Sequence, residues 1–195
     1  SIMARYFKKH KNTKLHTFTI GLYRIDPENG NRIIESPDIF AARTVADLYS
    51  DTIIHHEVLI TKEEMLNAIP ETVYQVETWD QTTIRASTPM WILSKYIKNQ
   101  TDVTVVLSGE GADEASGSYK YAKFAPSNEE LQKDCIRLLK QLQYYDVLRG
   151  DHASSFGLEI RTAFLDTDFL KFYMSIDPKY KTSHDKIEKH YLREA

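Results

Sequence analysis

Cysteine is nearly absent from this chain, and so are long apolar stretches. One cysteine among 195 residues excludes an internal disulfide and any metal cage built from several thiolates. Cys135 occupies an apolar position in a helical pattern, which favours a buried thiol over a nucleophile. No apolar run approaches the length of a membrane span, and no signal peptide is visible. The sequence therefore indicates a reducing, cytoplasmic setting, with no membrane as partner.

A strong excess of one charge is missing as well. The 25 basic and 28 acidic residues give a net charge of −3, and no basic stripe is interleaved with aromatic residues. Nucleic acid is therefore not a predicted partner. The seven histidines lack the spacing of zinc ligands, and His55 and His56 should point to opposite faces of a predicted strand. The composition is that of an ordinary globular protein, long enough to bury a core.

Helical and strand patterns alternate in the first half of the sequence. Strands are predicted over 16–22, 56–60 and 103–107, and the Asn-Gly turn within 26–31 suggests a small hairpin. Helices are predicted at 2–10, from Ser36 with the apolar face Ala42, Val45, Ala46 and Tyr49, from Thr61 with a capping box and a kink at Pro70, and at 89–98. This alternation predicts an α/β fold with a parallel sheet and right-handed crossovers.

The second half is predicted to be almost entirely helical. A long helix should start at Ser127 and reach about Leu148, followed by helices at 165–174 and 185–194. We therefore expect an α/β nucleotide-binding layer over 1–116 and a helical portion over 117–195. The chain opens at Ser1 inside a helical pattern without an initiator Met, and three strands are few for this architecture. A fragment of a longer protein is expected.

The segment Ser108-Gly109-Glu110-Gly111-Ala112-Asp113-Glu114 is the most informative one. It follows a β-branched run that predicts a buried parallel strand, and open α/β sheets bind ligands just beyond the carboxyl ends of their strands. Its glycines allow close approach to a phosphate, while its three carboxylates would repel that phosphate unless a divalent cation lies between them. This loop favours Mg-nucleotide chemistry. The alternative is a simple turn into a helix with acidic residues in its first turn.

Three other polar segments are candidates with structural alternatives. Thr82, Thr83 and Arg85 could hold a small carboxylate, although hydroxyls at a helix start are often caps. Glu159 and Arg161 are more simply explained as a structural ion pair. The charged helix at 186–194 should have most of its charges solvated, and spacing alone does not single out a lysine that contacts phosphate.

Taken together, the sequence resembles the synthetase domain of glutamine-dependent asparagine synthetases. Eight stretches carry the resemblance in one order: TFTIGL at 17–22, SPDIFAARTVA at 36–46, ETWDQTTIRAS at 77–87, SGEGADE at 108–114, YDVLRGD at 145–151, GLEIR at 157–161, FLD at 164–166 and IEKHYLRE at 187–194. They span nearly the whole chain.

The resemblance implies an ATP-pyrophosphatase fold, of the adenine-nucleotide α-hydrolase type. It implies that aspartate attacks the α-phosphate of MgATP to give β-aspartyl-AMP and pyrophosphate. Ammonia from a separate glutaminase domain then displaces AMP to give asparagine. Adenylation supplies the leaving group that a carboxylate lacks, and cations let the negatively charged reactants meet.

The resemblance also implies roles for individual residues. Ile20 corresponds to the residue beside adenine, and Ser108 and Gly109 to the pair that contacts the nucleotide. Asp113 corresponds to the Mg²⁺-binding aspartate, and Glu110 to a catalytic glutamate that accepts a proton from ammonia. The resemblance assigns aspartate binding to Thr82, Thr83 and Arg85.

Several family features are missing or altered. The phosphate loop Ser-Gly-Gly-x-Asp-Ser-Ser, whose aspartate is the second Mg²⁺ ligand, would end near Ser1. The glutaminase domain and a lysine expected beyond Ala195 are absent too, so the fragment alone should be inactive. Ala163 replaces a usual proline, the stretch from Asp151 to Gly157 is about one residue short, YAKFAP at 121–126 departs from the usual pattern, and 26–35 looks like an insertion.

Two alternatives and the assembly stay open. An amidoligase acting on another carboxylate, like the β-lactam-forming synthetases, would share the fold. A non-catalytic nucleotide-binding domain would have lost its phosphate loop. The sequence does not decide the oligomeric state, a homodimer being one option.

Overall fold

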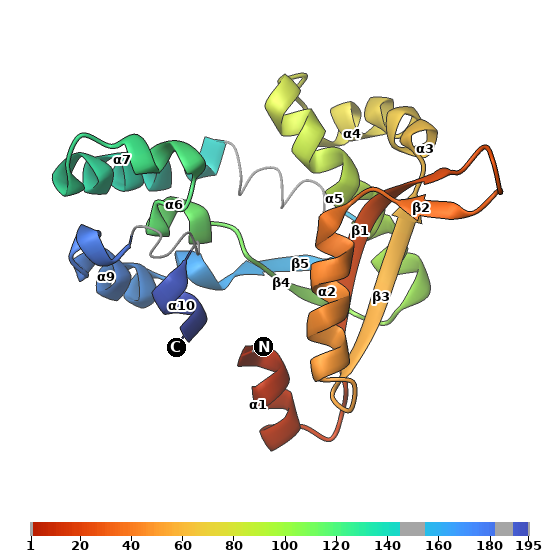
Figure 1. Cartoon of the computed structure of the whole chain (residues 1–195), viewed down its shortest axis with the longest axis horizontal. Helices are drawn as coiled ribbons and strands as arrows, with labels where there is room; N and C mark the ends of the chain where they lie inside the picture. Colours follow the sequence, from red (N-terminus) through yellow and green to blue (C-terminus); the bar gives the residue numbers. More distant parts are fainter. Residues whose placement is uncertain (1, 145–154, 182–188, 195) are drawn as a thin grey trace. The chain divides into compact units, whose positions relative to one another are not determined.

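The computed structural model describes residues 2–144, 155–181 and 189–194. Packing contacts divide the chain into two compact units. The first unit contains residues 1–104 and 152–158, and the second contains 105–151 and 159–195. Each unit is α/β, and each is described by itself (Figure 1).

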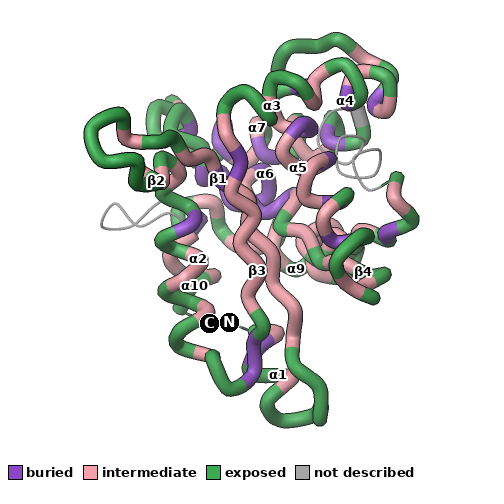
Figure 2. Tube along the Cα trace, turned by 90° about the vertical axis from the view of Figure 1, so that its right-hand side faces the viewer, coloured by how far each residue is buried: buried purple, intermediate pink, exposed green. Residues whose placement is uncertain are grey.

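The first unit is built on a parallel strand pair with a short antiparallel strand beside it. β1 (Leu15–Ile25) pairs in parallel with β3 (Ile53–Ile60), from Leu15 opposite Ile53 to Leu22 opposite Ile60. β2 (Arg32–Ile34) folds back on the end of β1, which confirms the predicted hairpin. Both long strands are only partly covered along most of their length (Figure 2).

Two helices cover opposite faces of this sheet. A Cβ on Gly21 of β1 would lie 2.5 Å from Ile39, which places α2 (Pro37–Leu48) on the Gly21 face. On the other face, Tyr96 of α5 (Gln81–Gln100) lies edge-on to His56. Because Tyr96 lies near the end of α5 and contacts the first half of β3, α5 runs antiparallel to the strands (Figure 1). The start of α5 is thereby directed toward the carboxyl ends of β1 and β3.

The helices of this unit confirm some predictions and correct others. α1 (Ile2–His10) lies as predicted, and Thr61 and Glu64 form the predicted capping box at the start of α3 (Lys62–Asn67). One helix ends at Asn67 and a new one begins at Ile69, in place of the predicted single helix kinked at Pro70. Pro70 therefore falls in the first turn of α4 (Ile69–Val76). Proline suits that position because the N–H that it lacks would have no intrahelical partner there.

Three details of these helices differ from the predictions. Ile39 is the fully buried residue of α2, whereas Val45 of the predicted apolar face is exposed and Ala42, Ala46 and Tyr49 are partly buried. Ser36 precedes α2, but its hydroxyl accepts a hydrogen bond from the Leu22 N–H at 2.8 Å instead of capping the helix. α5 starts eight residues before the predicted Pro89, because the Asp80 carboxylate accepts a hydrogen bond from the Thr83 N–H and fixes an earlier start.

The second unit has its own parallel strand pair. β4 (Val105–Ser108) pairs with β5 (Glu159–Thr162), from Val105 opposite Glu159 to Ser108 opposite Thr162. The predicted third strand of the sheet is thus bonded to a strand that the sequence did not predict. Val105 and Leu107 are 42% and 47% exposed, so the expectation of a buried strand was wrong for these two residues.

The other described elements of the second unit are helices. They are α6 (Ala112–Ser116), η1 (Lys120–Phe124), α7 (Asn128–Gln141), η2 (Leu142–Tyr144), η3 (Ala163–Leu165), α9 (Thr167–Ser175), η4 (Pro178–Tyr180) and α10 (His190–Glu194). Ser127 caps α7 as predicted, and Cys135 is buried against Ala122 and Leu131. The predicted helical residues 145–148 and 185–188 and the motif at 145–151 lie outside the described residues.

His55 and His56 face opposite sides of the first sheet, as predicted. The Nδ1 atom of His55 lies 2.9 Å from the Thr17 hydroxyl, on the α2 side. His56 stacks on Phe18, with 4.7 Å between ring centroids, and its Nε2 lies 2.9 Å from Nδ1 of His16. Two imidazole nitrogens at that distance can share one proton but cannot both carry one. Burial, followed by the charges of His16 and His55, lowers the pKa of His56.

We expect the first unit to lose stability as the pH falls below about 6.5, the ordinary pKa of histidine. A lowered pKa means that unfolded His56 binds a proton more readily than folded His56, so this stability is present above that pH and lost below it. Urea unfolding at a series of pH values would measure the effect. His56→Phe should flatten the profile while keeping the stack, and the exposed His10→Gln should not. An unchanged profile in His56→Phe would contradict this assignment.

Candidate functional site

The loop after β4 is shaped by Gly111. Its φ of +86° lies in the left-handed region, and a Cβ at this position would lie 2.1 Å from Cδ2 of Leu165. Only glycine satisfies both conditions. The loop turns tightly here, with the Glu110 N–H donating to the Ser108 hydroxyl at 3.3 Å and the Ala112 N–H donating to the Gly109 carbonyl at 3.2 Å.

Gly109 is in the opposite situation. It is exposed, its φ is not in the left-handed region, and a Cβ built on it would meet nothing within 4 Å. Neither packing nor backbone conformation within the chain therefore requires glycine at this position. Open space around a glycine at a strand end is what close approach of a ligand to the backbone needs.

The Asp113 carboxylate is held by two side chains. Its Oδ1 accepts a hydrogen bond from the Ser118 hydroxyl and lies 2.7 Å from the Lys189 ammonium. Burial by itself raises the pKa of the Asp113 carboxyl, but the hydrogen bonds from Lys189 and Ser118 outweigh burial and hold that pKa below its ordinary value. Asp113 is therefore ionised at neutral pH, and its side chain is still 42% exposed.

The other two carboxylates of the loop differ in their surroundings. Glu114 is only 5% exposed and accepts a hydrogen bond from the Tyr119 hydroxyl. Burial and this carboxylate raise the pKa of Tyr119, so the phenol keeps its proton. Glu114 is thus a structural group, whereas Glu110 is partly exposed. The loop offers solvent two acidic side chains, Glu110 and Asp113.

The predicted carboxylate-binding residues lie in the first turns of α5. Thr82 and Arg85 are exposed, whereas Thr83 is 4% exposed and its N–H is used by the Asp80 cap. No acidic residue lies in the first turn of α5 itself. A helix N-terminus with an exposed guanidinium nearby favours an anion.

Ile20 lies on β1, on the sheet face that α5 covers. It pairs with Val58, two residues after His56 on the same face. Because α5 runs antiparallel to β1, Ile20 and the start of α5 are both directed to the carboxyl end of the first unit's sheet. The structure thus places Ile20, Thr82, Thr83 and Arg85 in the first unit and Ser108, Gly109, Glu110 and Asp113 in the second.

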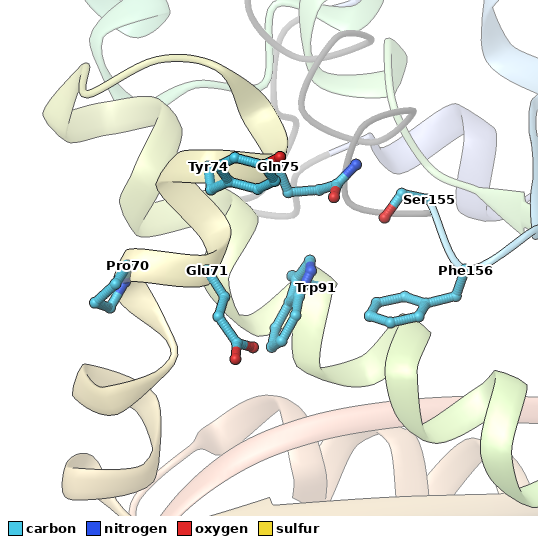
Figure 3. A pocket seen from close by; sticks show the side chains of 7 residues that line it. All are labelled: Pro70, Glu71, Tyr74, Gln75, Trp91, Ser155 and Phe156. Carbon is cyan, nitrogen blue, oxygen red and sulfur yellow. The ribbon is translucent and has the colours of Figure 1, made fainter.

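A separate hollow in the first unit contains none of the predicted site residues. It measures about 580 Å³ and is lined by Pro70, Glu71, Tyr74, Gln75, Trp91, Ser155 and Phe156. Trp91 and Phe156 lie next to each other in its lining, with ring centroids 5.4 Å apart (Figure 3). Lys95 lies 4.9 Å from the Trp91 ring centroid and 4.0 Å from Glu71. Tyr74 and the nearby Trp79 are 85% and 88% exposed.

Sequence reasoning missed Lys189 and Ser118 as partners of Asp113. The charged helix was expected to be solvated, yet the Lys189 side chain is only 21% exposed. Its positive φ of 55° is unusual for lysine and has no sequence signal. By contrast, Glu159 and Arg161 form the predicted structural ion pair at 2.6 Å, with both side chains well exposed.

No described helix is both long and apolar enough to cross a membrane. Within residues 2–144, 155–181 and 189–194, no three histidine, cysteine, aspartate or glutamate side chains gather as a metal-binding group. Among these described residues, Asp113 is therefore not part of such a group.

Comparison with known proteins decides the family. The chain matches the model of the asparagine synthase family over residues 1–134 and 123–195. The chain belongs to the asparagine synthase family. Its fold is therefore of the ATP-pyrophosphatase class.

Individual asparagine synthases agree with the family match. The glutamine-hydrolysing asparagine synthetase of Rattus norvegicus is 43% identical over 182 residues, which cover 93% of this chain and 30% of that protein. The Homo sapiens protein is 42% identical over the same shares. Asparagine synthetase 1 of Lotus japonicus is 43% identical over 204 residues, which cover 100% of this chain and 32% of its own length. The chain thus spans about a third of these asparagine synthases.

Gly111→Ala should destabilise the second unit by about 2 kcal/mol or more, from left-handed strain plus overlap with Leu165. Gly30→Ala is the matched control, because Gly30 has a φ of +72° but nothing within 4 Å of its Cβ position. It should cost only the strain, about 1 kcal/mol. Denaturant unfolding would measure both, and equal losses would rule out the Leu165 contact as a cause.

Proposed function

We propose that the protein in its full length makes asparagine from aspartate. The reaction is an ATP-dependent amidation through β-aspartyl-AMP that releases AMP and pyrophosphate. Ammonia comes from glutamine hydrolysed in a domain outside this chain, and the setting is cytoplasmic. Membership of the asparagine synthase family supports this proposal, and so does the strand-end loop with an open glycine followed by an ionised aspartate.

In this proposal the loop after β4 contacts the nucleotide. Ser108 and Gly109 would meet ATP, and Ile20 would lie beside adenine. The exposed backbone of Gly109 supports this role, because no atom of the described residues lies within 4 Å of a Cβ built there. The proposal assigns nucleotide binding to the α/β layer, residues 1–116. Residues 117–195 would form the helical portion of the same synthetase domain.

Asp113 is the proposed Mg²⁺ ligand. Magnesium takes oxygen ligands and often needs only one or two carboxylates besides phosphates and water, so an exposed, ionised Asp113 fits as one ligand. Bound there, Mg²⁺ would neutralise the phosphate charge that repels the aspartate carboxylate. The hydrogen bond from the Ser118 hydroxyl would help to orient the Asp113 carboxylate toward the cation.

Three residues of α5 are assigned to the aspartate substrate. Arg85 and Thr82 are exposed beside the helix start and can donate hydrogen bonds to a carboxylate. Thr83 is buried, so its contribution would be the N–H that fixes the Asp80 cap and hence the direction of the first turn. Glu110 is assigned the catalytic proton transfer, taking a proton from the attacking ammonia.

Asparagine formation predicts release of pyrophosphate from MgATP that depends on aspartate, with ammonia supplied. In the full-length protein, Glu110→Gln and Asp113→Asn should each lower the rate by about 100-fold or more. Glu129→Gln, an exposed residue in the first turn of α7, is the control and should match the wild type. Release that does not require aspartate would point to a synthetase acting on another carboxylate. ATP binding without any release would favour a non-catalytic domain.

Gly109→Ala should separate ligand contact from folding. The chain has room for a methyl group at residue 109, so the free energy of unfolding should change by less than about 0.5 kcal/mol. The Kd for ATP should rise about tenfold, because the methyl group would occupy space that the nucleotide needs. Asp102→Ala, an exposed change before β4, is the control for calorimetric titration. Unchanged ATP affinity in Gly109→Ala would remove Gly109 from the proposed site.

A further inference from the structure

The ammonium group of Lys189 places a positive charge beside the Asp113 carboxylate. Its ammonium lies 2.7 Å from Oδ1 and is largely buried, with 21% of the side chain exposed. Ser118 donates a hydrogen bond to the same oxygen. Both contacts therefore converge on Oδ1, and each is made within the second unit.

The segment that carries Lys189 is shaped for this contact. Lys189 directly precedes α10, and its carbonyl accepts a hydrogen bond from the Arg193 N–H at 3.0 Å. It adopts a φ of +55°, a conformation that a lysine adopts only at some cost. A surface lysine that merely needed a partner could reach a carboxylate from an ordinary backbone. The ion pair therefore links the loop after β4 to the start of α10.

A divalent cation at Asp113 would meet this ammonium at close range. Like charges a few ångströms apart repel strongly, and the repulsion is greater where water is partly excluded. The Lys189 ammonium and a metal ion would therefore compete for Oδ1, and a cation that binds this oxygen requires the ammonium to withdraw.

We propose that Lys189 is a positioning residue that holds Asp113 as a counter-cation and leaves its carboxylate when a divalent cation binds. The inference rests on the proposed role of Asp113 as a metal ligand and extends that role to the start of α10. Withdrawal of Lys189 removes one ion pair between the loop and the residue that precedes α10. Binding at Asp113 should thereby loosen the start of α10.

The test is the affinity of the full-length protein for Mn²⁺, measured by electron paramagnetic resonance with saturating α,β-methylene-ATP. Lys189→Met should tighten Mn²⁺ binding about fivefold, since even a water-like dielectric makes removal of a nearby charge worth that much. Lys189→Arg should behave as wild type. Lys171→Met, which removes an exposed lysine 3.7 Å from Asp168, is the control. A merely structural lysine would give weaker or equal binding when removed.

Amide hydrogen exchange gives a second readout that does not depend on the folding of Lys189→Met. Mn²⁺ with the same ATP analogue should speed exchange at residues 190–194 in the wild type. It should have no such effect in Asp113→Asn. If Lys189→Met does not fold, this response decides the question, and its absence would overturn the proposal.

The outcomes separate this inference from the proposed function. If Asp113→Asn binds Mn²⁺ as tightly as the wild type, the metal role of Asp113 fails and the inference with it. If Asp113→Asn loses affinity while a folded Lys189→Met gains none, Asp113 remains the ligand and the counter-cation role of Lys189 is refuted.

Discussion

The close approach of Leu165 to Gly111 is the constraint on which the second unit depends. A side chain from η3 lies where any other residue at position 111 would place its own Cβ. The contact joins the loop after β4 to the segment after β5, the two ends of one parallel pair. The direction in which α6 leaves the loop, and hence the place of Asp113, follows from it. The absence of a Cβ at residue 111 thus determines the geometry of the acidic loop.

Local chemistry made much of the fold predictable. The Thr61 capping box, the Ser127 cap, the hairpin at 26–31 and the opposite faces of His55 and His56 each depend on residues close in sequence. The failures share a different cause. Proline at position 89 looked like a helix start because its missing N–H is harmless there, but the Asp80 cap outweighed that preference. β5, the partner of β4, lies more than fifty residues further along the chain. No local pattern in the sequence of β5 predicts this pairing.

The candidate site divides in the same way. The glycines and carboxylates of the loop could be predicted from the sequence, because a strand followed by small and acidic residues is a local pattern. Which of the loop's carboxylates remains exposed to solvent could not be predicted from the sequence. Glu110, Asp113 and Glu114 are all acidic residues of one short segment. In the structure, however, Tyr119 donates a hydrogen bond to Glu114, and Lys189 forms an ion pair with Asp113. Membership of the asparagine synthase family agrees with the resemblance seen in the sequence, but the surroundings of each acid come only from the fold.

The two tryptophans of the chain lie in contrasting environments. Trp79, three residues before Thr82, is 88% exposed, whereas Trp91 is 8% exposed and lies under Lys95 and beside Phe156. Indole emission shifts to longer wavelength in water, so this chain carries two fluorescence signals that differ in wavelength. A soluble quencher would extinguish the Trp79 signal first. The remaining emission would report the interior of the first unit, while the quenchable part would report events beside the first turn of α5.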